Sequence, residues 1–123
     1  MATLNDRVFD NGLTLLDTEA NKITVTSQES TTYASANSTH ALGASTSLSI
    51  AAPADRSGGG RKVTVAAISD GAVSATGTAT HYAIIDTSNT RLLVTGSLTA
   101  SQAVTNGNTF TLASFDIGIP DPS

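Results

Sequence analysis

The fold class is decided by a run of strand-forming residues in the second half of the chain, Gly77-Thr78-Ala79-Thr80-His81-Tyr82-Ala83-Ile84-Ile85-Asp86. The run has the length of a strand, turn residues bound it, and threonine or other small residues fill the positions between the apolar ones, as is typical of a β-strand. Residues 61–68, 91–98 and 108–117 are runs of the same kind. Together the four runs predict a mainly β domain.

Turn-forming residues separate these runs. Three consecutive glycines, Gly58-Gly59-Gly60, predict a turn or linker before the first run, because glycine is costly inside regular structure. Residues 86–90 predict a hairpin loop, and Asn106-Gly107 predicts a tight turn before the last run. The prolines at 120 and 122 lack a backbone donor, so residues 118–123 are predicted to form a tail that does not continue a strand.

The first half of the chain is more varied. Residues 4–20 carry apolar side chains at spacings of about three and four, which predicts a helix with one apolar face, although Asp10-Asn11-Gly12 is also compatible with a hairpin turn. Residues 22–27 alternate isoleucine and valine with threonine and predict a strand with one buried face. Residues 28–47 lack apolar periodicity and predict a long loop, part of which would pack on a neighbour or form an edge strand. Residues 48–50 suggest a short strand.

These elements predict an antiparallel β-sandwich or barrel-like domain with an N-terminal helical arm. We place the arm at residues 1–21, the β-domain at 22–117 and the C-terminal tail at 118–123. Thr, Ser and Ala supply 53 of the 123 residues and aromatic residues only 4%, so the core is thin and oligomerisation is a reasonable way to bury more surface.

Composition argues against several classes of function. Six basic and ten acidic residues give a net charge of −4, which offers no electrostatic footprint for nucleic acid. The absence of cysteine excludes disulfides, cysteine zinc sites and thiol catalysis. The N-terminus has no apolar signal core, and no run reaches the roughly 18 apolar residues of a membrane span. We expect a protein that is made in a cytosol and stays soluble there until it assembles, with no membrane partner.

Several segments, in a fixed order, resemble a family of small structural proteins, mostly of undefined role, from the virions of tailed bacteriophages and prophages. The segments are residues 6–10 (Asp-Arg-Val-Phe-Asp), 27–29 (Ser-Gln-Glu), 31–34 (Thr-Thr-Tyr-Ala), 60–65 (Gly-Arg-Lys-Val-Thr-Val), 77–83 (Gly-Thr-Ala-Thr-His-Tyr-Ala) and 107–110 (Gly-Asn-Thr-Phe). The chain departs from this pattern at Ser30, where a proline is expected. The resemblance implies a virion component without indicating its part of the virion.

No catalytic, cofactor or metal site is predicted. His81 and Asp86 are five positions apart on one predicted strand and point to opposite faces, so they cannot form a dyad there. The glycines before Arg61 and Lys62 lack the spacing of a phosphate loop and lead into a strand instead of a helix. The acidic residues of the N-terminal segment do not match a calcium loop. Candidate subunit contacts are Asp6, Phe9, Tyr33, Arg56, Arg61 and Lys62, of which the three cations would pair with acidic groups of a neighbour.

The sequence therefore predicts a non-enzymatic virion protein, in first place a capsid decoration or cement protein that binds copies of itself and the head shell. The alternative is a tail, neck or fibre component that contributes to attachment to the host surface, with residues 28–47 and 86–90 as contact regions. A small hydrolase that uses His81 is the third hypothesis. The three differ in copy number per particle, in binding to host cells and in the effect of His81→Ala on a measurable activity.

Overall fold

The structure, a computed structural model, describes residues 6–119, and their side chains from residue 11 onward. Strands account for 52% of the chain, the sheets are antiparallel and a helix stands at the N-terminus. The predicted fold class is thereby confirmed. Contacts group the chain into two compact units, one of residues 1–19, 49–67 and 113–123 and one of residues 20–48 and 68–112. The expected division at residues 21 and 117 follows the sequence, whereas this grouping follows contacts in space.

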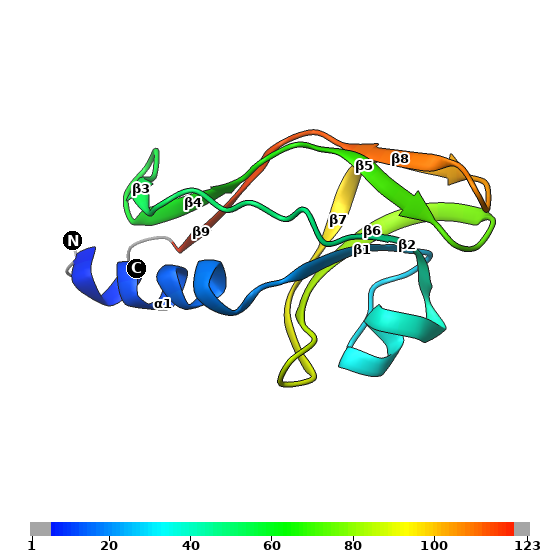
Figure 1. The fold of residues 1–123 in the computed structure, drawn as a ribbon. Coiled ribbons are helices and arrows are strands. Elements are labelled where there is room, and N and C mark those ends of the chain that lie inside the picture. Colours follow the sequence, from blue (N-terminus) through cyan, green and yellow to red (C-terminus); the bar gives the residue numbers. More distant parts are fainter. Residues whose placement is uncertain (1–5, 120–123) are drawn as a thin grey trace. The chain divides into compact units, whose positions relative to one another are not determined.

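The larger unit, residues 20–48 and 68–112, is built on a six-stranded antiparallel sheet (Figure 1). Its strands follow the order β7-β6-β1-β2-β5-β8 across the sheet. Their bounds are β1 Lys22–Thr26, β2 Ala41–Ser45, β5 Ile68–Val73, β6 Gly77–Asp86, β7 Arg91–Val104 and β8 Thr109–Leu112, and a short π-helix, η1, spans Ser35–Thr39.

The six-stranded sheet is strongly curled. Its two edge strands, β7 and β8, would lie about 24 Å apart in a flat sheet, but only the four residues 105–108 join them, and that connection can span about 17 Å at most. The Gln102 side chain of β7 donates from Nε2 to the Thr111 carbonyl of β8 at 2.8 Å. Curling therefore brings the two edges towards each other at this end, as in a barrel.

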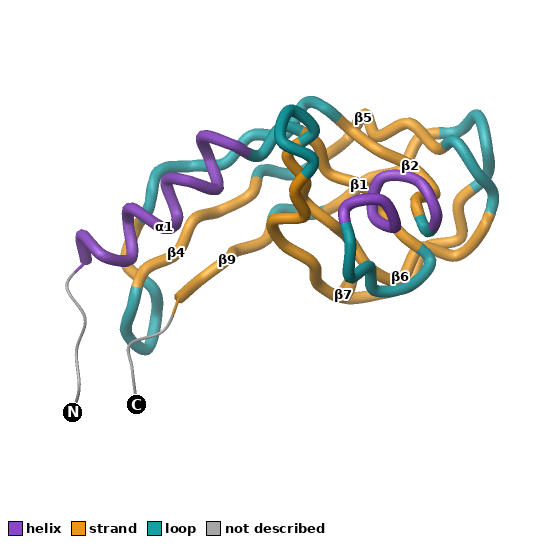
Figure 2. The backbone as a smooth tube through the Cα atoms, turned by 90° about the horizontal axis from the view of Figure 1, so that it is seen from below, coloured by secondary structure: helices purple, strands orange, loops and turns teal. Residues whose placement is uncertain are grey.

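Strand β1 is buried on both faces, which differs from the single buried face that its alternation predicted. Ile23 and Val25 are buried, and so are Thr24 and Thr26. Thr24 can be buried because its hydroxyl donates to the Ala36 carbonyl of η1 at 2.9 Å. Figure 2 shows η1 as the short purple coil beside β1 and β2. A threonine on a strand is expected to be exposed to solvent unless the segment that covers it is known. Here the covering segment, η1, begins nine residues after the end of β1.

The prediction of a long loop over residues 28–47 was wrong in part. Strand β2 lies within it, and it is an internal strand between β1 and β5, not an edge strand. Its residues are small because the Phe110 ring packs closely there: a Cβ at Gly43 would lie 3.0 Å from that ring. The strand expected at residues 48–50 is reduced to a single bridge between Ile50 and Val65.

The smaller unit combines helix α1, Asp6–Glu19, with a three-stranded antiparallel sheet in the order β3-β4-β9. The strands are β3 Ala54–Asp55, β4 Arg61–Val65 and β9 Phe115–Ile119. The helix predicted at residues 4–20 is confirmed over its described length. Strand β9 extends two residues beyond Ile117, so the prediction that the strand does not continue past residue 117 was wrong for Gly118 and Ile119, and residues 120–123 lie outside the described part.

Helix α1 covers one face of β4. Leu13 and Leu16 of the helix are buried, as are Val63 and Val65 of the strand. Side chains alternate along a strand, so Lys62 and Thr64 point to the face away from these valines. That second face carries polar groups.

Candidate functional site: a basic cleft on the three-stranded sheet

The register of β4 with β9 gives the second face its side chains. Lys62 lies opposite Gly118, and Thr64 lies opposite Asp116. The Asp116 carboxylate accepts from Lys62 Nζ at 3.0 Å and from Thr64 Oγ1 at 2.7 Å. These hydrogen bonds, the one from Thr64 foremost, hold the pKa of Asp116 below its ordinary value. The carboxylate is therefore charged at neutral pH and fixes the position of the Lys62 ammonium.

The glycine-rich segment between β3 and β4 is a tight turn, not a flexible linker. Gly58, Gly59 and Gly60 all have φ between 89° and 104°, a region that residues with a Cβ rarely adopt. The Arg56 backbone N–H donates to the Gly60 carbonyl at 3.1 Å, and the Gly59 N–H donates to the Arg56 carbonyl at 3.1 Å. The turn closes the β3–β4 hairpin and fixes the backbone of Arg56 beside it.

The Arg56 side chain lies across β9 at Gly118. A Cβ at Gly118 would stand 2.9 Å from Arg56 Cδ and 3.1 Å from Nε, so the side chain can take this course because residue 118 is glycine. Arg56 Nη1 donates to the Gly59 carbonyl at 3.0 Å and approaches the Ser57 carbonyl at 3.5 Å. The turn thus holds the guanidinium from one side.

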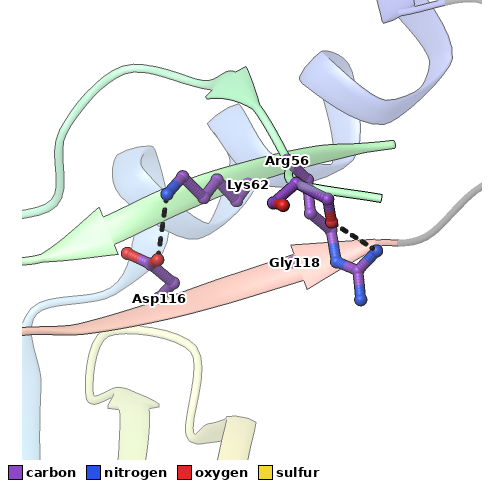
Figure 3. Close-up of a pocket in the computed structure, with 5 residues that line it drawn as sticks. Arg56, Lys62, Asp116 and Gly118 are labelled. Atoms are coloured by element: carbon purple, nitrogen blue, oxygen red, sulfur yellow. Dashed lines mark hydrogen bonds and ion pairs between the residues drawn. The ribbon is translucent and has the colours of Figure 1, made fainter. Parts of the chain in front are cut away.

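These groups surround an open cleft of about 340 Å³, lined by Arg56, Ser57, Lys62, Asp116 and Gly118. In Figure 3 Lys62 points to Asp116, whereas the Arg56 guanidinium lies near Gly118 and points away from both. Two cations and one carboxylate give the cleft a net positive charge. We call this group of five residues the basic cleft. Its exposed position and its charge suit an anionic group of another molecule.

The cleft brings together two of the three cations that the sequence singled out. Arg56 and Lys62 line it, but Arg61 alternates to the other face of β4. Arg61 Nη1 forms an ion pair with Asp55 Oδ1 at 2.6 Å, and Nη2 approaches the Pro53 carbonyl at 3.4 Å. Arg61 therefore braces the β3–β4 hairpin, and its predicted role as a subunit contact stays a prediction.

The other three candidate contacts are placed as follows. Tyr33, in the larger unit, packs partly buried against Ala36, Ala83 and Ile85, so only its exposed part is available to a neighbour. Asp6 and Phe9 belong to helix α1, but their side chains lie outside the described part. Their predicted contacts stay predictions.

Asp116 and Gly118 were not predicted as site residues from the sequence. Asp116 has no other acidic residue next to it in the sequence, and Gly118 was assigned to the C-terminal tail. Both become part of the cleft because β9 pairs with β4, in which the partner of Gly118, Lys62, stands 56 positions earlier. No local sequence pattern predicts that two strands so far apart in the sequence pair with each other. The signal that was present is the strand pattern of residues 108–117, which indicated a partner strand without naming it.

His81 and Asp86 bond to different groups. His81 Nδ1 and Thr80 Oγ1 are 2.8 Å apart, and the Thr80 hydroxyl also lies 3.0 Å from the Ser27 carbonyl. The buried Asp86 carboxylate accepts from the Asn89 side chain at 2.7 Å, and this bond, first among several, holds its pKa below its ordinary value. Asp86 caps the hairpin loop before β7, which confirms the loop predicted at residues 86–90.

Within residues 11–119, whose side chains the structure describes, no three histidine, aspartate or glutamate side chains gather as metal ligands would. Neither described helix has the length and apolar composition of a membrane span. No protein-family model, curated protein or solved structure matches the chain. The basic cleft is therefore interpreted from its own residues.

Proposed function

We propose that this chain is a non-enzymatic structural protein of a tailed-bacteriophage virion and, within the virion, a decoration or cement subunit bound to the head shell. The observation that carries the proposal is the basic cleft: an open, charged surface site held in place by a glycine turn and a strand pair. Such a site suits recognition of an acidic group on a neighbouring protein. The resemblance to small virion proteins supplies the context in which such neighbours repeat.

Assembly by repetition makes weak contacts sufficient. A solvent-exposed ion pair contributes about 0–1 kcal/mol, so a simple pair of this kind supplies only part of the free energy with which two proteins associate. In a symmetric particle each subunit makes the same contact many times, and linked contacts multiply in effect. The cleft and the half-exposed side chains of β7, the long edge strand of the curled sheet, are the surfaces that we assign to other copies and to the shell.

A specific observation favours the tail, neck or fibre alternative in one respect. The hairpin loop at residues 87–90 is exposed throughout, as a loop that touches a host surface would be. The second region considered for such contact, residues 28–47, is mostly taken up by η1 and the internal strand β2, so only its exposed turns remain for that role.

The stoichiometry of the chain in purified particles tests the proposal. Quantitative mass spectrometry against the major capsid protein measures it directly. A copy number comparable with that of the shell protein supports a head decoration role, because decoration follows the symmetry of the shell. A copy number many times lower would assign the chain to the tail, neck or fibre. Its absence from particles would refute the virion assignment.

A further inference from the structure

The Arg56 guanidinium has an edge that the chain itself does not use. Its Nη1 atom donates to turn carbonyls, whereas no acceptor for Nε or Nη2 exists within the described part of the chain. Nε–H and the adjacent Nη2–H form a parallel pair of donors that matches the two oxygens of a carboxylate. The side chain is also fixed in advance by the turn and by Gly118, so less entropy is lost when an acid binds.

Most carboxylates of the same chain are already engaged. Of those whose surroundings the structure describes, Asp55, Asp70, Asp86, Asp116 and Glu19 each interact with another group of the chain. Asp17 and Glu29 are exposed and make no such interaction within residues 11–119. Asp17 belongs to helix α1, whereas Glu29 lies on the loop after β1, between the exposed Gln28 and the buried Ser30. A longer side chain on a loop is the better shape for entry into a cleft.

We infer that the basic cleft binds the Glu29 carboxylate of a second copy of this chain, with Arg56 as the bidentate partner. The charges are complementary, since the cleft is positive and the chain as a whole carries a charge of −4. The two surfaces differ, so the contact is heterologous and builds rings or open arrays instead of a closed two-fold dimer. This inference deepens the proposed function, on which it rests for the repetition of the contact in a particle.

Sedimentation velocity of the isolated full chain over a concentration series tests the inference. At low ionic strength the wild-type protein should associate as concentration rises, and salt above about 0.1 M should weaken this association because it screens exposed charges. Arg56→Glu and Glu29→Arg should each weaken the association by about tenfold or more, as expected when one partner of a charged hydrogen bond is lost. The double variant, which restores opposite charges, should recover much of the loss.

Two further variants control the result. Asp17→Lys changes the net charge by the same amount as Glu29→Arg but removes a carboxylate outside the proposed contact, so it should leave the association within about twofold of wild type, in line with the small effect of distant surface charges. Gly118→Ala keeps every charge, yet its Cβ would displace Arg56 Cδ, so it should weaken the association. Circular dichroism checks that each variant is folded.

Two outcomes would overturn the inference. A wild-type chain that stays monomeric at low salt and high concentration has no such contact. An association that Asp17→Lys abolishes and Glu29→Arg does not would place another carboxylate in the cleft. Neither result bears on particle stoichiometry, so the failure of this contact and the failure of the virion proposal are separate findings.

Discussion

Gly71→Ala should destabilise the larger unit, because the Phe110 ring lies directly over this glycine. A Cβ at Gly71 would stand 2.3 Å from Phe110 Cε1 and Cζ and 2.6 Å from Cδ1, distances far shorter than any ordinary carbon contact. The ring cannot yield easily, since it is 2% exposed and also lies against Gly43, where a Cβ would be 3.0 Å away. Either the ring or strand β5 must move.

The magnitude follows from two opposing terms. Overpacking a tight core costs typically about 1–3 kcal/mol, and a contact this short belongs at the upper end. Replacing glycine by alanine lowers the entropy of the unfolded chain and stabilises by about 0.4–1 kcal/mol. The steric term is larger, so we expect a net loss of about 2 kcal/mol. A loss of this size lowers the melting temperature of a domain of this length by several degrees.

Urea unfolding followed by far-ultraviolet circular dichroism measures the loss as a lower midpoint at unchanged slope. Gly12→Ala is the matched control: Gly12 is exposed in helix α1 and its Cβ would meet only Ile119 Cδ1, at 3.9 Å. The same chemical change should therefore stabilise there, by about 0.5–1 kcal/mol. If Gly71→Ala were as stable as the wild type, the packing of Phe110 on β5 described here would be wrong.

Three further predictions follow from buried or charged groups. Ser30 is 3% exposed and its hydroxyl has no partner within the described residues, so Ser30→Ala should raise the free energy of unfolding by about 1 kcal/mol, and a loss of stability would show that the hydroxyl is satisfied. The hydrogen bonds from Thr64 and Lys62 hold the pKa of Asp116 below its ordinary value. The contribution of this carboxylate to stability is therefore present above about pH 4 and is lost as pH falls through the folded pKa. Asp116→Asn should reduce the dependence of the urea midpoint on acid pH, and an unchanged dependence would contradict this. Burial raises the pKa of the Tyr82 phenol above its ordinary value. Ultraviolet titration of the folded protein should therefore find a phenol that ionises at a pH above the ordinary value, and this step should be missing from Tyr82→Phe.

Strands with large apolar or β-branched side chains were readily predicted from the sequence. The observed strand Gly77–Asp86 coincides with its predicted run, and Arg91–Val104 contains the run predicted at 91–98. The last predicted run, 108–117, is divided between β8 and β9, which belong to different units. Periodicity reports that a segment is extended and half-buried, but it does not report which sheet the segment joins.

The strands that sequence reasoning missed consist of small and polar residues. Strand β2 is Ala-Leu-Gly-Ala-Ser, and β5 contains Ser-Asp-Gly-Ala. Neither segment alternates large apolar residues with polar ones, so the hydrophobic pattern predicts a loop. They become strands because the large Phe110 ring, far along the chain, needs partners without side-chain bulk at Gly43 and Gly71. The Phe110 ring fills the space that Gly43 and Gly71 leave in the core.

The candidate site was predictable by charge and unpredictable by geometry. Arg61 and Lys62 are adjacent and read as one basic pair, yet alternation along β4 places them on opposite faces, one beside Asp55 and the other in the cleft with Asp116. Arg56, six residues before Lys62, joins it in the cleft because the glycine turn reverses the chain between them. Substitutions at Arg61 and Lys62 should therefore not act as equivalents: loss of Arg61 removes a brace of the hairpin, and loss of Lys62 alters the charge of the cleft. A variant that removes both together would combine a change in stability with a change in binding, so the assembly role of the cleft has to be tested at Arg56 and Gly118, which take part in neither of these two ion pairs.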